Sequence, residues 1–252
     1  MKLWIIEALS DNYIYAIQPA SDPKNIRIID AGEAEPVIAF LEENNLNLKT
    51  IYITHHHFDH TNGIKALKEK YNCNVIGPEY EKAFIKRMDK GLKENDRFTD
   101  AGIKFQIFHL PGHTSGHIGY YLPEEKIFFS GDTLFSLGCG RIFEGTAEEM
   151  WHSLKKIRDL PDDTQIYAGH EYTLSNAEFV LSVLGETNAL KAFLKNCMQR
   201  LDQGHSTYPT TVAEQKEFNP FFMADQKQFS EIFSEDSTIE TFKNLRLKKD
   251  NF

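Results

Sequence analysis

Short runs of β-branched and aromatic residues alternate with helical patterns from the start of the chain to about Tyr172. Residues 49–54 form a β-branched run that predicts a buried strand, and residues 103–108 alternate between apolar and polar side chains as a half-buried strand does. Similar apolar runs predict further strands, which cover residues 25–29, 126–130 and 164–168. The first part of the chain is therefore predicted to mix short strands with helices.

One helix of this first part is predicted to follow the first group of histidines. It would bury Ile64, Leu67 and Tyr71, which recur at the spacing of one helical face. Thr61 or Asn62 precedes this periodic segment, and either side chain is suited to cap the N-terminus of the helix.

The pattern changes near Tyr172. Helical periodicity dominates afterwards, as in residues 177–184 and 190–201, and strand signals are few. Residues 203–211 predict a loop, and Asp236 is expected to begin a last helix with an acidic first turn. We therefore predict two domains, which cover residues 1–172 and residues 173–252.

Length and charge limit the partners of the chain. Its 252 residues, 41% of them hydrophobic, are enough for one large domain and a smaller one. The formal net charge of −9 at pH 7 disfavours nucleic acid and anionic membranes, because phosphate groups favour proteins with clustered cations. We expect a monomer that binds a small molecule.

Cysteine usage and the N-terminal segment predict a cytoplasmic protein. The three cysteines, Cys73, Cys139 and Cys197, are widely spaced and form no Cys-x-x-Cys motif, which argues against a disulfide framework or a structural zinc site. Glu7 and Asp11 interrupt the apolar start too early for a signal peptide, and no apolar run is long enough to cross a bilayer.

Candidate metal ligands follow four of the predicted strands. The first cluster, Thr-His-His-His-Phe-Asp-His, comes directly after the strand over residues 49–54. A single His-x-His is more often a surface or packing feature, but four clusters at four strand ends make coincidence a poor explanation. Together they predict a two-metal hydrolase whose seven ligands are His55, His57, Asp59, His60, His113, Asp132 and His170.

The spacing of the first cluster suits two metal ions. His55 and His57 are two residues apart and point the same way in extended backbone, whereas Asp59 and His60 follow a turn and can face a second ion. Imidazole and carboxylate ligands together suit zinc, iron or manganese. No cysteine occurs in the clusters, which argues against a closed structural zinc site and predicts an open coordination position.

Other polar residues near these clusters have less certain roles. His117 is a candidate ligand, but its place at the start of an apolar run favours a contact to a ligand instead. Asp30 either forms a turn or contacts a ligand histidine, and His56 is expected to point away from the metals. Structural roles are expected for the three remaining histidines, His109, His152 and His205.

The order of these motifs resembles the metallo-β-lactamase superfamily over roughly residues 1–172. The resemblance implies an α/β fold, a four-layer αββα sandwich, followed here by a smaller C-terminal helical domain. It also implies two divalent metal ions, with zinc as the expected metal and iron or manganese as alternatives. One ion would be bound by His55, His57 and His113, the other by Asp59, His60 and His170, and Asp132 would bridge them.

Segments without metal ligands carry a narrower resemblance, to the hydroxyacylglutathione hydrolase (glyoxalase II) family. These segments are residues 138–146, 170–176, 219–221 and 246–250, so the resemblance spans essentially the whole chain. It implies hydrolysis of S-(2-hydroxyacyl)glutathione, chiefly S-D-lactoylglutathione, to glutathione and D-lactate in methylglyoxal detoxification. It also implies that the glutathione part is bound by Arg141, Phe143, Tyr172, Arg246 and Lys249.

Two of these substrate positions depart from the better-known form of the family, which has Lys and Tyr there. Arg141 keeps the positive charge and adds a planar fork suited to a carboxylate. Phe143 lacks a hydroxyl, so one hydrogen bond to the substrate is lost. Arg246 and Lys249 are three residues apart and would share one helix face, although a basic C-terminal stretch alone is more often a solvated tail.

The implied metal centre suits a thioester. Two divalent cations carry four positive charges, and Asp59, Asp132 and a bridging hydroxide remove three, so a net charge of plus one remains to attract an anionic transition state. Metals lower the pKa of bound water and polarise a carbonyl oxygen, so that no separate general base is required. We expect attack of the hydroxide on the thioester carbonyl, with Asp59 and Asp132 as the catalytic residues.

Three other interpretations differ in testable ways. A glutathione persulfide dioxygenase would share the fold but use fewer metal ligands and consume oxygen. A flavodiiron electron-transfer protein would need a glutamate where this chain has His57. A non-catalytic module that binds metal or glutathione would show no turnover when loaded with metal.

Overall fold

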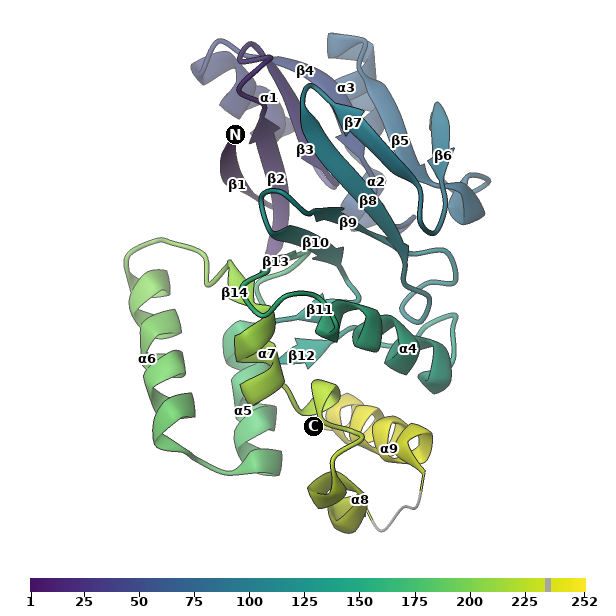
Figure 1. Cartoon of the computed structure of the whole chain (residues 1–252). Helices are drawn as coiled ribbons and strands as arrows, with labels where there is room; N and C mark the ends of the chain where they lie inside the picture. The colour runs from purple at the N-terminus through teal and green to yellow at the C-terminus, as the bar shows by residue number, and fades with distance from the viewer. Residues whose placement is uncertain (234–236) are drawn as a thin grey trace.

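The computed structural model describes residues 1–233 and 237–252. Two six-stranded sheets pack face to face, and helices cover the outer face of each sheet (Figure 1). The four-layer αββα arrangement predicted above is confirmed. In Figure 1 the N-terminal sheet lies at the top, and the helices that follow residue 172 gather at the lower end of the molecule.

The first sheet contains the N-terminal strands in sequence order. Antiparallel pairs join β1, β2 and β3, and parallel pairs join β3 through β6. Its strands are β1 (Lys2–Ala8), β2 (Asn12–Gln18), β3 (Asn25–Ile29), β4 (Asn47–Tyr52), β5 (Asn74–Pro78) and β6 (Lys90–Leu92).

The second sheet has the order β14-β13-β10-β9-β8-β7, and most of its pairs are antiparallel. Its strands are β7 (Arg97–Asp100), β8 (Ile103–His109), β9 (Ile118–Leu122), β10 (Ile127–Gly131), β13 (Gln165–Ala168) and β14 (Thr210–Thr211). A small hairpin of β11 (Leu134–Phe135) and β12 (Gly138–Cys139) follows β10.

Of the hydrophobic clusters in the described residues, three correspond to the three interfaces between layers, and a smaller one lies mainly among the helices after residue 172. The first lies between the first sheet and the helices α1 (Glu35–Glu43) and α3 (Ile64–Tyr71). The second lies between the two sheets and is rich in aromatic side chains such as Tyr52, Phe105 and Phe129. The third lies between the second sheet and the lower helices, which include α4 (Ala147–Arg158).

The C-terminal helices complete this third core. Phe179, Phe221 and Phe242 belong to the same apolar cluster as Trp151 of α4 and Phe128 of β10. The segment after Tyr172 therefore packs directly on the outer helix layer of the sandwich. Its helices are α5 (Thr173–Leu184), α6 (Asn188–Asp202), α7 (Val212–Phe218), the 3₁₀ turn η2 (Pro220–Phe222), α8 (Lys227–Phe233) and α9 (Thr238–Asp250).

Three local predictions differ from the structure or fall outside the described residues. The cap predicted at Thr61 or Asn62 is wrong, because α3 begins after Gly63 and the short helix α2 (Phe58–Thr61) occupies the preceding residues. The predicted loop over residues 203–211 ends in the strand β14, whose register is fixed by pairing with β13. Asp236 lies outside the described residues, which resume directly before α9.

Within the described ranges, no helix combines the length and the apolar character needed to cross a membrane.

Candidate metal centre

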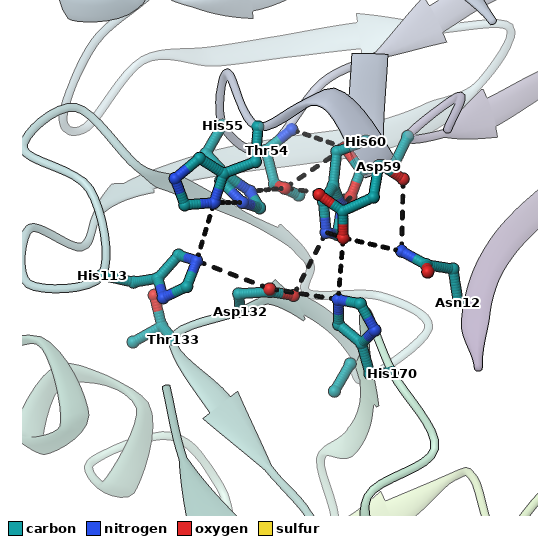
Figure 2. A network of polar contacts seen from close by, with 12 residues as sticks. Asn12, Thr54, His55, Asp59, His60, His113, Asp132, Thr133 and His170 are labelled. Atoms are coloured by element: carbon teal, nitrogen blue, oxygen red, sulfur yellow. Dashed lines mark hydrogen bonds and ion pairs between the residues drawn. The ribbon is translucent and has the colours of Figure 1, made fainter. Parts of the chain in front are cut away.

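All four ligand clusters lie at the ends of strands, as predicted. His55 follows β4, His113 follows β8, Asp132 directly follows β10, and His170 follows β13. The first of these strands belongs to one sheet and the other three to the second sheet, so the centre forms where ends of the two sheets approach each other. Figure 2 shows the labelled side chains pointing toward one another.

Three imidazoles form the first donor group. Nδ1 of His57 lies 3.1 Å from Nε2 of His55 and 3.0 Å from Nε2 of His113. Burial lowers the pKa of all three rings below the ordinary histidine value, so their nitrogens are neutral donors near pH 7. Three lone pairs directed at one point suit a single divalent cation.

The second donor group contains Asp59, His60 and His170. Nε2 of His170 lies 3.2 Å from Oδ2 of Asp59, and Nε2 of His60 lies 3.4 Å from the same oxygen. Asp59 and His60 are on the short helix α2, whose first residue directly follows His57. This turn of helix brings both side chains to His170, although the ring of His60 also lies 4.2 Å from that of His55, so the two groups adjoin each other.

Asp132 lies between the two groups. Its Oδ2 is 3.5 Å from Nε2 of His113 and 3.2 Å from Nε2 of His170, and its Oδ1 is 3.4 Å from Nε2 of His60. One carboxylate therefore faces nitrogens of both groups, as a bridging ligand must. The predicted set of seven residues converges at a single centre.

The two groups differ in charge. Burial would lower the pKa of His170, but Asp132 and Asp59 outweigh it and raise this pKa to about 10. Burial likewise opposes the charged form of His60, whose pKa Asp132 and Asp30 raise well above the ordinary value. The carboxylates therefore favour positive charge at the second group, and a metal cation would supply that charge.

Two further observations fit a pair of divalent cations. Nε2 of His60 and Oδ1 of Asp132 are buried without a hydrogen-bond partner among the described residues. A Cβ atom on Gly169 would lie only 2.3 Å from Oδ1 of Asp132, so the backbone there is shaped to leave room for the carboxylate. The chain therefore has a site for divalent metal ions, built from imidazole and carboxylate donors.

Outer contacts fix the tautomers of the ligand rings. Oδ2 of Asp30 lies 2.8 Å from Nδ1 of His60, and Oδ1 of Asp11 lies 2.8 Å from Nδ1 of His170. These hydrogen bonds leave the Nε2 atoms free for metal. The backbone carbonyl of Arg141 lies 2.9 Å from Nδ1 of His113 in the same way.

His117 and His56 lie outside the donor set, as predicted. Nε2 of His117 accepts a hydrogen bond from the backbone N–H of Asp132 at 3.1 Å, and its ring stacks on His55 with 4.8 Å between ring centroids. His56 turns away from the centre and lies between two glutamates. Its Nδ1 is 3.0 Å from Glu81 and its Nε2 is 3.3 Å from Glu144.

A cleft of about 540 Å³ opens beside the metal donors. It is lined by members of both donor groups and by all five residues that the sequence assigned to the glutathione part of a substrate, Arg141, Phe143, Tyr172, Arg246 and Lys249. The ring of Tyr172 stacks on His170 at 4.8 Å, and the ring of Phe143 lies 5.2 Å from that of His113. The aromatic residues thus lie at the metal end of the cleft.

The three cations of the cleft differ in availability. Arg246 is only 5% exposed, and its Nη1 donates to the backbone carbonyl of Cys139 at 2.8 Å. Lys249 is half-buried, and its Nζ donates to the backbone carbonyl of Ser175 at 3.2 Å. Arg141 is exposed, so Arg141 and Lys249 have the N–H groups that a ligand can reach.

Comparison with known families agrees with this geometry. The model of the metallo-beta-lactamase superfamily matches residues 12–170, and the model of the hydroxyacylglutathione hydrolase C-terminus matches residues 171–252. A hydroxyacylglutathione hydrolase from Pelagibacter ubique is 44% identical over 253 residues, which cover 100% of each chain. The chain belongs to the hydroxyacylglutathione hydrolase family. A second member of this family, from Rhodopseudomonas palustris, is 42% identical over 98% of this chain and 97% of its own.

Solved structures show the fold beyond the hydroxyacylglutathione hydrolase family. The ETHE1 protein of Myxococcus xanthus is 26% identical and superimposes with a TM-score of 0.66 over 87% of this chain and 84% of its own. BLEG-1, a B3 metallo-beta-lactamase, has a TM-score of 0.67 at 24% identity over 87% of this chain and 99% of its own. Both structures share the metallo-beta-lactamase fold with this chain.

Several residues of the centre were not anticipated from the sequence. Thr54 contacts Nδ1 of His55 at 2.9 Å, and the side chain of Asn12 donates to Oδ2 of Asp59 at 3.1 Å. Thr54 directly precedes the first ligand, and its polarity at the end of an apolar strand was the available signal. Asp11 lies on the turn before β2 and Asn12 is the first residue of β2, and polar residues are ordinary at such a place, so no signal marks them.

Proposed function

We propose that this chain hydrolyses S-(2-hydroxyacyl)glutathione thioesters, chiefly S-D-lactoylglutathione, to glutathione and the 2-hydroxy acid. In a cell this reaction would belong to methylglyoxal detoxification. The observation that carries the proposal is the shared cleft, in which metal donors and the cations Arg141 and Lys249 line one cavity. A thioester with an anionic tail can lie with its carbonyl at the donors and its carboxylate at the cations.

Binding of the glutathione part would use the residues that line the cleft. Arg141 and Lys249 offer N–H donors to a carboxylate, and charge-assisted hydrogen bonds of this kind are stronger than neutral ones. Phe143 and Tyr172 provide aromatic surface beside His113 and His170. The substrate would thus be oriented from both ends before any bond breaks.

Two divalent cations, for which we propose zinc with iron or manganese as alternatives, would lower the pKa of water and polarise a carbonyl oxygen. The chain itself would hold the carboxylates in place. The amide of Asn12 donates to Asp59, and buried Asp132 has a backbone N–H bound to His117. We propose Asp59 and Asp132 as the catalytic carboxylates on this basis.

A thioester suits these residues better than an ester or amide. Its leaving thiolate needs little protonation, so the mechanism requires no strong acid in the cleft. Burial and the nearby carboxylates Asp11 and Asp132 raise the pKa of Tyr172 to about 12. Its phenol therefore stays protonated near neutral pH and can donate a hydrogen bond to the substrate.

We further propose a cytoplasmic monomer of two domains, residues 1–172 and residues 173–252. Support comes from the three cysteines, which are buried and form no disulfide. The net charge of −9 and the cations Arg141 and Lys249 in the cleft together favour a small anionic ligand over nucleic acid or a membrane.

The decisive experiment is anaerobic turnover of S-D-lactoylglutathione by metal-quantified protein, followed as thiol release. A chelated sample and a thioester that lacks glutathione serve as controls. Rapid, metal-dependent release confined to the glutathione thioester is expected. Absence of release by protein with two bound metals would contradict the proposal, and oxygen uptake with glutathione persulfide would then identify a dioxygenase.

A further inference from the structure

The cationic end of the cleft contains a carboxylate of the protein itself. Oδ1 of Asp250 accepts hydrogen bonds from Nε of Arg246 at 3.1 Å and from Nη2 of Arg246 at 2.9 Å. The same oxygen lies 3.8 Å from Nε of Arg141. Asp250 also lines the cleft together with Lys249, so this carboxylate faces the place where an anionic ligand would bind.

Helix stability does not explain an acidic residue at this position. Asp250 is the last residue of α9, where the helix dipole favours cations and disfavours anions. Lys248 and Lys249 follow that preference and Asp250 does not. Its pairing with Arg246, four residues earlier, offsets the unfavourable placement. The position of Asp250 therefore indicates a role beside the cations Arg141, Arg246 and Lys249 of the cleft.

The pairing leaves Arg246 little capacity for a ligand. Two of its nitrogens bond to Asp250, the third bonds to the carbonyl of Cys139, and the guanidinium lies over the ring of Phe221 at 5.0 Å. Arg246 is thus held in place before any ligand arrives, and its charge is matched by Asp250. An incoming carboxylate would be bound mainly by Lys249 and Arg141.

We propose that Asp250 is an affinity-determining residue, an internal carboxylate that orients Arg246 and opposes the binding of the glutathione glycine carboxylate. This inference rests on the proposed function. Nε of Arg141 lies 3.8 Å from Oδ1 of Asp250, so a ligand carboxylate that binds Arg141 and Lys249 comes close to the carboxylate of Asp250. The two negative charges repel each other at that separation. Weaker binding of the glutathione part favours release of the product, which carries the same carboxylate as the substrate.

The first test compares wild type with Asp250→Asn, which removes the charge but keeps an oxygen that Arg246 can bond. Binding of S-methylglutathione, which is not hydrolysed, is measured by calorimetry on metal-loaded protein. The dissociation constant should fall by about fivefold, the effect of one unit charge nearby in a partly solvated site. The KM for S-D-lactoylglutathione should fall in parallel. An unchanged or weaker affinity would overturn the inference.

A second ligand isolates the carboxylate. The glycine amide of S-methylglutathione lacks that charge, so wild type and Asp250→Asn should bind it equally well. An equal gain for the amide and the acid would show that Asp250 acts by some route other than repulsion of the carboxylate, and would also overturn the inference.

Asp163→Asn is the matched control, since it removes one negative charge at an exposed residue outside the cleft. It should leave the affinity for S-methylglutathione unchanged, and an equal gain there would contradict a local effect. If Asp250→Asn fails to fold by circular dichroism, Asp250→Ser removes the same charge with a smaller side chain. Wild type that neither binds nor hydrolyses glutathione thioesters would contradict the proposed function instead.

Discussion

The carboxylate of Asp30 and the imidazole of His60 lie 2.8 Å apart, with Oδ2 of the aspartate on Nδ1 of the ring. Oδ1 of the same carboxylate accepts the backbone N–H of Thr54 at 2.8 Å, directly before the first ligand histidine. Asp30 thus connects the two donor groups. Its backbone has φ of +60°, a conformation that Asp and Asn adopt more readily than other side chains.

We expect Asp30→Asn to weaken metal retention. The amide keeps the backbone conformation but has one acceptor oxygen instead of two, so either His60 or Thr54 loses its partner. Loss of such an outer contact typically costs at least tenfold in metal affinity. Metal content after dialysis against graded chelator measures the effect. The control Asp163→Asn, at an exposed residue outside the cleft, should retain metal as wild type does. Wild-type metal retention by Asp30→Asn would show that the contact between Asp30 and His60 has no role in metal binding.

Gly169→Ala should damage the same centre by steric means. The added Cβ would lie 2.3 Å from Oδ1 of Asp132 and 2.8 Å from Cε1 of His60, so the bridging carboxylate or the ring must shift. We expect loss of metal and of activity together in a protein that remains folded. Gly185→Ala is the control for a strained substitution without a steric contact, because the φ of Gly185 is +71° but a Cβ there meets no atom within 4 Å, and its metal content should stay at the wild-type level. Full metal content in Gly169→Ala would show that the centre adjusts.

The candidate metal ligands could be predicted because each of their four clusters follows its own strand. His55 and His57 share a direction through their two-residue spacing, which is a local property of the sequence. The contacts that orient these ligands are not local. Asp11 lies 159 residues from His170, and Asn12 lies 47 residues from Asp59. Such pairs depend on how the layers pack, which periodicity in one segment does not report.

Arg246→Ala and Lys249→Ala should separate stability from substrate affinity. Arg246 is buried and hydrogen-bonded, so its loss removes two hydrogen bonds to Asp250 and the donor to the carbonyl of Cys139, and should lower the free energy of unfolding by about 3 kcal/mol. Lys249→Ala should leave stability near wild type and raise KM about tenfold, the effect of one charge-assisted hydrogen bond. Urea unfolding and steady-state kinetics measure the two effects.

An effect of Arg246→Ala on KM without an effect on stability would change the role assigned to Arg246. If Arg246→Ala changed KM alone and kept the unfolding midpoint, Arg246 would contact the substrate directly. Metal content should stay at the wild-type level in both variants, since neither residue contacts a donor of the centre.

Substrate affinity should begin to decrease at a lower alkaline pH than it would if Lys249 had the ordinary pKa of a lysine. Burial, with help from Arg246 and Arg141, lowers the pKa of Lys249 below its ordinary value. Its positive charge is therefore lost as pH rises through this lowered pKa, before the ordinary lysine value of about 10.4 is reached. KM for S-D-lactoylglutathione should rise over that range while KM for its glycine amide stays level.

Lys249→Arg provides the control for this pH profile. Arginine stays charged throughout the range, so the alkaline rise in KM should disappear in this variant. A rise of equal size in Lys249→Arg would assign the effect to a group other than Lys249.

The buried ion pairs of Arg27 should make stability depend on pH. Arg27 is 4% exposed, and its Nη2 and Nη1 lie 2.7 Å from Asp100 and Asp22. Burial would raise the pKa of Asp100, but hydrogen bonds from Arg27 and Tyr52 outweigh it and lower this pKa. The stabilisation is therefore present above the unfolded-state pKa of about 3.9 and is lost as pH falls through the lower folded-state pKa.

Arg27→Met should accordingly destabilise the metal-free protein more at pH 7 than at acidic pH. At neutral pH we expect a loss of about 2 kcal/mol, because Asp100 and Asp22 lose the hydrogen bonds from Arg27, while the hydroxyl of Tyr52 still donates to Asp100. Near pH 3 the two carboxyls begin to bind protons in the variant, and its difference from wild type should shrink. Urea unfolding of both proteins at the two pH values, with chelator present throughout, measures this change. The control is Lys126→Met, which removes an exposed ion pair with Asp163 and should keep the wild-type unfolding midpoint at both pH values. A difference between Arg27→Met and wild type that stays constant across pH would show that packing rather than charge stabilises Arg27.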